Sequence, residues 1–180
     1  MSSRNLAYMT APERPPPRIP CAGAPASPLR LSLSSRTAIE LPVGDIVGDF
    51  LAAALGLADE LRMRITCAVH EAVLNAALHG NLALANEGRD HAARGDEFAA
   101  AIAARLADPA LAARRCQIRV RWTAATVLVR ITDQGAGFAA PAAVPDRALP
   151  WGRGIPVIKA LTTRCRWVRG GRSLMLRFAR

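Results

Sequence analysis

The 180-residue sequence has a single lysine, Lys159, although it carries 24 basic residues and a formal net charge of +10. Lys159 lies between Ile158 and Ala160, so the GxxxxGK[ST] loop of a Walker A nucleotide site is excluded. The four cysteines form no CxxC pair, and we expect reduced thiols in a cytoplasmic protein. No apolar run approaches the length of a membrane span, and the N-terminus lacks the apolar core of a secretory signal.

Aromatic residues are also scarce, at 4% of the sequence. The arginines are spread along the chain, and no aromatic side chains alternate with them for stacking on bases. This pattern argues against nucleic acid as the partner. It favours an acidic protein partner or a solvated arginine-rich surface.

The chain divides into two parts by composition. Residues 1–28 are rich in proline and polar residues and lack apolar periodicity, which predicts a disordered tail. Residues 29–180 have the length and patterning of one domain. Within it, residues 82–115 interrupt the pattern with a polar stretch and one amphipathic helix ended by Pro109, so we predict a helical insertion there.

Strands and helices follow from the periodicity of the apolar residues. Helical spacing predicts helices over residues 43–55, ended by Gly56, and 58–79, ended by Gly80-Asn81, with a shorter one in IPVIKALTT. Alternation predicts five strands, two of them joined at residues 123–125 and two turning at Gly170-Gly171. The strands are LRLSLSS, CQIRVRWTA, TVLVRITD, RCRWVRG and SLMLRFA. We therefore predict an α+β, two-layer sandwich with a mainly antiparallel sheet and helices on one face.

A narrow polar stripe crosses the long apolar helix. Glu71, Asn75 and His79 recur every fourth residue and share one face, with small apolar residues beside them. Buried polar groups need partners, so this stripe predicts the floor of a ligand cleft, although an exposed helix face is the alternative. His79 alone also suits a helix C-terminus.

Two glycine-rich segments add to this stripe. In ITDQGAGF, Asp133 ends a strand beside Gly135 and Gly137, where a carboxylate can accept from an amino group of a flat ligand; a simple turn is the alternative. The same glycines mimic a dinucleotide fingerprint, but prolines follow instead of a helix. In WGRGIPVIKAL, Gly152, Arg153 and Gly154 precede a helix, an arrangement that can hold an anion.

The order of these segments is more specific than any one of them. EAVLNAALHGN, DQGAGF and GRGIPVIKAL resemble the N, G1 and G2 boxes of the ATPase superfamily shared by gyrase, heat-shock chaperones, histidine kinases and mismatch-repair ATPases. Within that superfamily, whose fold is the Bergerat-type sandwich, the chain is similar to the anti-sigma-factor serine/threonine kinases. The resemblance covers residues 29–180.

The resemblance implies a role for each box. It assigns Mg²⁺ ligation to Asn75, general-base catalysis to Glu71, adenine recognition to Asp133 and a lid hinge to Gly135 and Gly137. It assigns binding of the ATP phosphates to Gly152, Arg153 and Gly154, and it places His79 in the nucleotide site.

The implied partners are regulatory proteins. The resemblance predicts a cytoplasmic kinase that phosphorylates a STAS-type antagonist and controls a sigma factor or similar regulator, and homodimers are common among such kinases. ARRCQIRVRW, after the insertion, resembles a subgroup that works beside response regulators and PP2C-type phosphatases. The lid, Ala139 to Pro150, is short and nearly uncharged, which keeps an alternative open: an ATP-binding partner-switch module, or an ATPase, without protein kinase activity.

Overall fold

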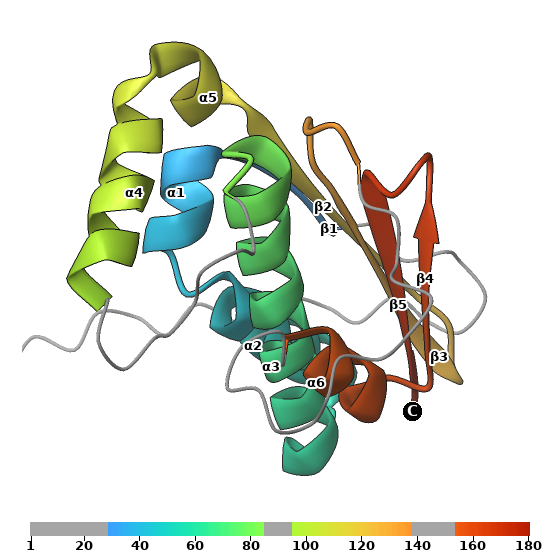
Figure 1. The fold of residues 1–180 in the computed structure, drawn as a ribbon. Coiled ribbons are helices and arrows are strands. Elements are labelled where there is room, and N and C mark those ends of the chain that lie inside the picture. The colour runs from blue at the N-terminus through green and yellow to red at the C-terminus, as the bar shows by residue number, and fades with distance from the viewer. Residues whose placement is uncertain (1–28, 85–94, 138–153) are drawn as a thin grey trace, which may run out of the picture.

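A five-stranded sheet packed against a layer of helices forms the domain (Figure 1). The computed structural model describes residues 29–84, 95–137 and 154–180. The strands are β1 (Leu29–Ser34), β2 (Arg115–Trp122), β3 (Thr126–Thr132), β4 (Arg164–Val168) and β5 (Ser173–Ala179). The helices are α1 (Ser35–Glu40), α2 (Val43–Leu55), α3 (Asp59–Asn75), the π-helix η1 (Ala76–Asn81), α4 (Gly95–Ala107), α5 (Pro109–Ala113) and α6 (Gly154–Leu161).

The sheet has the order β1-β2-β3-β5-β4, and every neighbouring pair is antiparallel. Among the described elements, the helices lie on one side of the sheet (Figure 1). The predicted α+β sandwich is therefore confirmed. Within the described ranges, no helix is long and apolar enough to cross a membrane.

The hydrophobic core lies between the sheet and the helices α2, α3 and α6. Along each central strand, buried residues alternate with more exposed ones. The buried residues, such as Ile118, Val129 and Leu176, share the face that points towards the helices. These side chains pack against helix residues such as Val69 and Ile158 in one cluster. At the edge of this core, the Phe50 ring meets Trp122 edge-on, with ring centroids 6.1 Å apart.

Both predicted hairpins form. Residues 123–125 connect β2 to β3, and Gly170 and Gly171 turn the chain between β4 and β5 with left-handed backbone angles. Helix α2 ends where it was predicted to end, because Gly56 adopts a left-handed conformation and donates its N–H to Ala52 O.

Three local predictions were wrong. Helix α1 was not predicted; its six residues are too few for a periodic pattern, and Ser34 caps it from outside. The α-helix predicted to reach His79 instead ends at Asn75 and widens into η1, where Leu82 N–H donates to Ala77 O, five residues back. Pro109 begins a second helix, α5, because proline suits the first helical position and Asp108 caps it.

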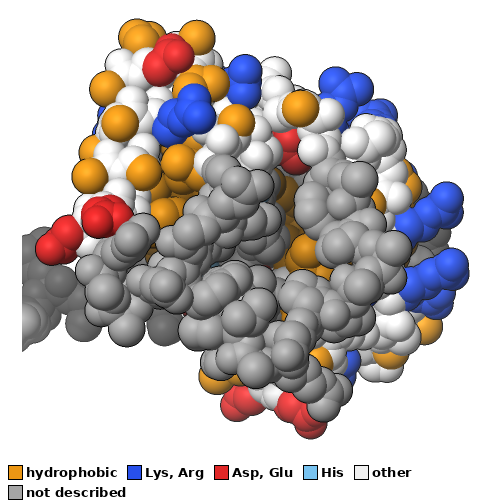
Figure 2. Space-filling view, viewed as in Figure 1, with side chains coloured by type: hydrophobic (Ala, Val, Ile, Leu, Met, Phe, Trp, Pro, Cys, Tyr) orange, Lys and Arg blue, Asp and Glu red, His pale blue; other side chains and the backbone are white. Residues whose placement is uncertain are grey.

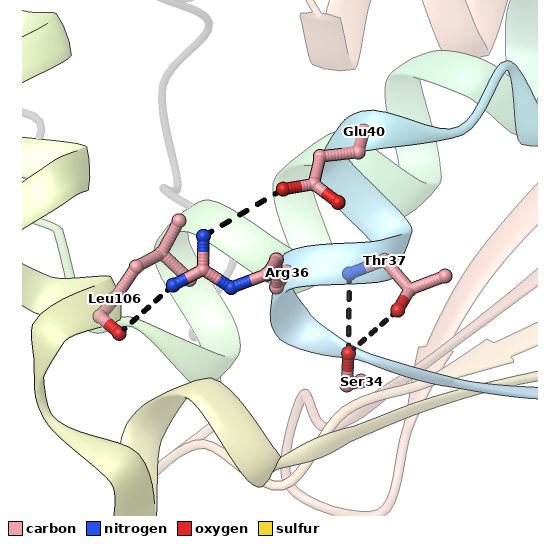
Figure 3. A network of polar contacts seen from close by, with 5 residues as sticks. All are labelled: Ser34, Arg36, Thr37, Glu40 and Leu106. Carbon is pink, nitrogen blue, oxygen red and sulfur yellow. Dashed lines mark hydrogen bonds and ion pairs between the residues drawn. The ribbon is translucent and has the colours of Figure 1, made fainter.

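Helices α4 and α5, from the predicted insertion, attach to the domain through α1 (Figure 3). The Arg36 guanidinium donates to Leu106 O at 3.4 Å and pairs with Glu40 at 3.6 Å. The buried Ser35 hydroxyl donates to Leu111 O and Arg114 O. These bonds connect α1 to the C-terminal end of α4 and to α5.

Candidate nucleotide site

Helix α3 and its extension η1 place the polar stripe beside the sheet. Glu71 and Asn75 lie one turn apart on α3, and both are half-buried while Ala72, Val73 and Ala76 around them are buried. The stripe is therefore neither an open helix face nor a sealed core position. It lies at a boundary, where polar groups can meet a ligand.

The first turn of α6 closes against this stripe. A Cβ atom added at Gly154 would lie 2.9 Å from Oε2 of Glu71 and 3.1 Å from Nδ2 of Asn75. A side chain at this position would have to displace the end of the Glu71 side chain, so glycine lets the start of α6 lie directly beside it. The structure thus brings together three residues that the sequence separates by about eighty positions, and it places a helix N-terminus, which attracts anions, next to a carboxylate and an amide.

The other end of the site is formed by Asp133, which directly follows β3. Its Oδ1 accepts the N–H of Gly135 at 2.8 Å, and its own N–H donates to Arg172 O. A Cβ at Gly80 would lie 2.7 Å from Asp133 Oδ1, so η1 touches the carboxylate directly. Because Gly80 lies in η1, which continues the helix that carries Glu71 and Asn75, Asp133 lies beside the same helical segment.

Burial controls the ionisation of Asp133. It raises the pKa of this carboxyl above its usual range, while the Gly135 N–H, its own N–H and the Arg172 guanidinium lower it. The neighbouring Cys116 thiol is fully buried, and burial together with the Asp133 charge raises the pKa of Cys116 to about 12. Cys116 is thus a neutral packing residue, and Asp133 is a partly desolvated acceptor.

The remaining predicted residues have different surroundings. Nδ1 of His79 lies 2.8 Å from Leu84 O, so it holds the chain after η1. Gly135 is buried, and a Cβ there would collide with the Gly80 carbonyl. Gly137 has a left-handed backbone and packs against Gly170. Gly152 and Arg153 lie outside the described residues.

Sequence reasoning assigned no site role to Asn81, which holds the segment after Asp133. This residue is fully buried; its Oδ1 accepts the Gln134 N–H at 2.8 Å, and its carbonyl accepts from Arg114 at 2.7 Å. It therefore fixes the segment after Asp133 to the end of η1. Arg172, whose carbonyl and charge both act on Asp133, was also missed. Asn81 ends the EAVLNAALHGN motif but was interpreted only as a helix end, and no motif marks Arg172.

A separate hollow of about 460 Å³ lies at the opposite end of the domain. It is lined by the α2–α3 connection, Arg64 and Arg180. Both guanidiniums already donate to backbone carbonyls, Arg64 to Leu161 and Arg180 to Leu55 and Thr123. They serve the fold, and the predicted site residues lie elsewhere.

Comparison with known sequence families identifies the domain. The histidine kinase-like ATPase domain matches residues 35–179, which is most of the chain. The chain belongs to the histidine kinase-like ATPase family. As a member of this ATP-binding family, it has its candidate nucleotide site where the three motifs converge.

Comparison with solved structures gave a distant match. The chain is similar to the crystal structure of the RsbU and RsbW domains of Rv1364c from Mycobacterium tuberculosis, at 16% identity and a TM-score of 0.48. The match covers 87% of this chain and 32% of that one, so the chain spans about a third of that protein's length. The comparison with curated proteins gave no match.

The site of this histidine kinase-like ATPase domain fits a nucleotide with its metal. In the described parts of the chain, no three His, Cys, Asp or Glu side chains gather as a metal site. A Mg²⁺ ion here would rely on one protein oxygen and on the phosphates, which is the coordination that Mg²⁺ favours. The Asn75 amide supplies such an oxygen beside the glycine that opens α6.

Replacing Asn81 should loosen the Asp133 end of this site. In Asn81→Ala the Gln134 N–H loses its acceptor, so we expect about 1 kcal/mol of lost stability, visible as a lower melting temperature. Gln117→Ala, which truncates an exposed amide on β2, is the control and should melt as the wild type does. An unchanged melting temperature in Asn81→Ala would show that Gln134 finds another acceptor.

Proposed function

We propose that the protein is an ATP- and Mg²⁺-dependent serine/threonine kinase that phosphorylates a STAS-type antagonist and thereby controls a sigma factor or similar regulator. The observation that carries this proposal is the convergence of Glu71 and Asn75 on the first residue of α6, Gly154. A carboxylate, a metal-ligating amide and a helix N-terminus are the groups that phosphoryl transfer needs at one place.

Each end of the groove has a separate task in this proposal. Asp133, held by Gly135 and raised in pKa by burial, accepts a hydrogen bond from the adenine amino group. Asn75 ligates Mg²⁺, which neutralises phosphate charge when bound. Gly152, Arg153 and Gly154 hold the phosphates, and Gly135 and Gly137 allow the lid to move. His79 supports the nucleotide site through its bond to Leu84.

Glu71 is the residue that would make the domain an enzyme. It is half-buried and one turn from Asn75, so it can take the proton of a serine or threonine hydroxyl that approaches the metal end. An intact carboxylate at this position favours kinase activity over simple binding.

The alternative function is a nucleotide-dependent partner switch, or an ATPase, without phosphoryl transfer to protein. The sequence of residues 139–150 favours it, because this lid is short and nearly uncharged and offers few groups to hold a closed state. In both forms of this alternative Asp133 and Asn75 keep their roles. Glu71 has no role in a partner switch, whereas in an ATPase it would take the proton of a water molecule.

Phosphoryl transfer to protein separates the two functions. Purified protein is incubated with Mg²⁺, γ-labelled ATP and candidate STAS domains, alone and together with PP2C-type phosphatases. We expect label on a serine or threonine of the STAS domain, and none on a STAS domain whose acceptor is replaced by alanine. ATP binding without label on any candidate would favour the partner switch. A pull-down with the same purified protein tests whether it associates with a sigma factor, with a response regulator or with a second copy of itself.

A further inference from the structure

The face of the sheet that points away from the helices is rich in arginine. Its outward side chains include seven arginines from all five strands, called here the arginine face: Arg30, Arg119, Arg121, Arg130, Arg164, Arg166 and Arg177. Six are exposed and Arg130 is half-buried. None of the five strands contains an aspartate or a glutamate. In Figure 2 arginine side chains project along the sheet side of the molecule, while carboxylates gather over the helices.

The strand register aligns these arginines in two rows. The first row crosses every strand and contains one apolar residue: Arg30, Arg119, Arg130, Met175 and Arg166. The second row lies two residues further along and again contains one: Arg121, Leu128, Arg177 and Arg164. Five strands at ~4.8 Å spacing make the face ~19 Å wide, with the rows ~7 Å apart.

This arrangement destabilises the isolated domain. Arg119 faces both Arg30 and Arg130 directly, and like charges opposite each other in a sheet repel. The ion pairs of Arg36 and Arg62 lie on the helices, and the five strands that carry the face contain no carboxylate of their own to neutralise it. Within the face, the Arg130 guanidinium donates to the Met175 sulfur. An anionic partner would relieve this repulsion.

The chemistry of the face selects a protein partner over nucleic acid. The indoles of Trp122 and Trp167 have the strand parity of the core, so no aromatic ring of the described strands is offered for base stacking. Leu128, 36% exposed, and Met175 lie among the guanidiniums. An apolar centre ringed by arginine is the composition of protein interfaces, and a phosphate backbone offers nothing apolar to cover it.

We infer that the arginine face is a docking surface for an acidic protein partner, one that presents carboxylates around an apolar contact. Guanidinium pairs with carboxylate through two parallel hydrogen bonds, and the rows match glutamates one helical turn apart. The inference is independent of the proposed kinase function, since the face lies on the opposite side of the sheet from the nucleotide site. It gives the net charge of +10 a specific location and task.

The test uses a labelled helical peptide with glutamates one turn apart and leucines between them on the same face, and a second peptide with glutamine in place of glutamate. At about 0.15 M salt, fluorescence anisotropy should show the wild type binding the first peptide and not the second. Arg119→Gln/Arg130→Gln should weaken binding about tenfold, while its melting temperature stays level or rises. Arg36→Gln/Arg105→Gln, on the helical layer with the same change in charge, should bind as the wild type does.

A mixed-sequence DNA duplex and Leu128→Ser distinguish the partner classes. Leu128→Ser should weaken binding of the acidic peptide and leave the affinity for the duplex unchanged. If the duplex binds more tightly than the peptide and loses affinity in Arg119→Gln/Arg130→Gln, the face reads phosphates and the inference is overturned. It is equally overturned if the acidic peptide does not bind, or if both double variants bind it alike, because the face is then only a solvated surface.

Discussion

Asp133→Asn is expected to bind ATP about 30-fold more weakly than the wild type while remaining folded. Asparagine keeps the Oδ1 acceptor that receives the Gly135 N–H at 2.8 Å, but it turns an amide donor towards the adenine amino group, itself a donor. Two donors that face each other without an acceptor cost about 2 kcal/mol of binding free energy, which corresponds to the roughly 30-fold loss of ATP affinity. Isothermal titration calorimetry with ATP and GTP gives the measurement.

The raised pKa of Asp133 predicts the stability of the same variant. Because the native pKa lies above the unfolded one, the carboxyl stabilises the fold at low pH, and this contribution falls as pH rises from the unfolded to the native pKa. At neutral pH the charge is therefore a cost that asparagine removes, and the variant should melt at the wild-type temperature or above it. GTP, with an acceptor in place of the amino group, should gain affinity relative to ATP. ATP binding equal to the wild type would remove Asp133 from the adenine site.

Glu71→Gln is expected to lose turnover by about 100-fold and to keep its ATP affinity. The amide preserves the size of the side chain beside Gly154 but cannot take a proton, and general-base catalysis typically contributes this factor. Phosphoryl transfer or hydrolysis is measured under saturating ATP, with affinity measured in parallel.

Two further variants give this experiment its controls. Glu60→Gln makes the same chemical change in the exposed first turn of α3 and should turn over ATP as the wild type does. Asn75→Ala should instead weaken binding only when Mg²⁺ is present, because its assigned role is the metal. A wild-type rate in Glu71→Gln would rule out the general-base role, and a wild type without turnover would put the partner switch first.

The sequence predicted the sheet because strands and turns depend on local signals. Alternation identifies the strands, and Gly56 and Gly170-Gly171 mark ends and turns by the backbone angles they allow. The proximity of Gly154 to Glu71 and Asn75 was implied by the family resemblance, since the three segments are far apart in the chain.

The features that were missed depend on tertiary contacts. Asn81 is buried by the fold and acts through Gln134 and Arg114, which the sequence gives no reason to pair with it. Helix α1 forms where Ser35 can bond to the insertion. The two arginine rows are visible only once the strand register is known, because evenly scattered arginines look like an ordinary solvated surface.

The wide turn η1 determines where this helix can lose a residue. A π-helical turn holds one more residue than the α-helical turn it replaces, and here it separates Glu71 and Asn75 from Gly80, which touches Asp133. Deletion of one residue within Ala76–Asn81 would let this turn rewind as an ordinary α-helix, with the chain before and after it nearly in place. The same deletion within α3, which has no extra residue to lose, would rotate the two parts of the helix relative to each other by about 100°. A change of chain length that η1 can absorb would therefore separate Asp133 from Glu71 and Asn75 if it fell one turn earlier.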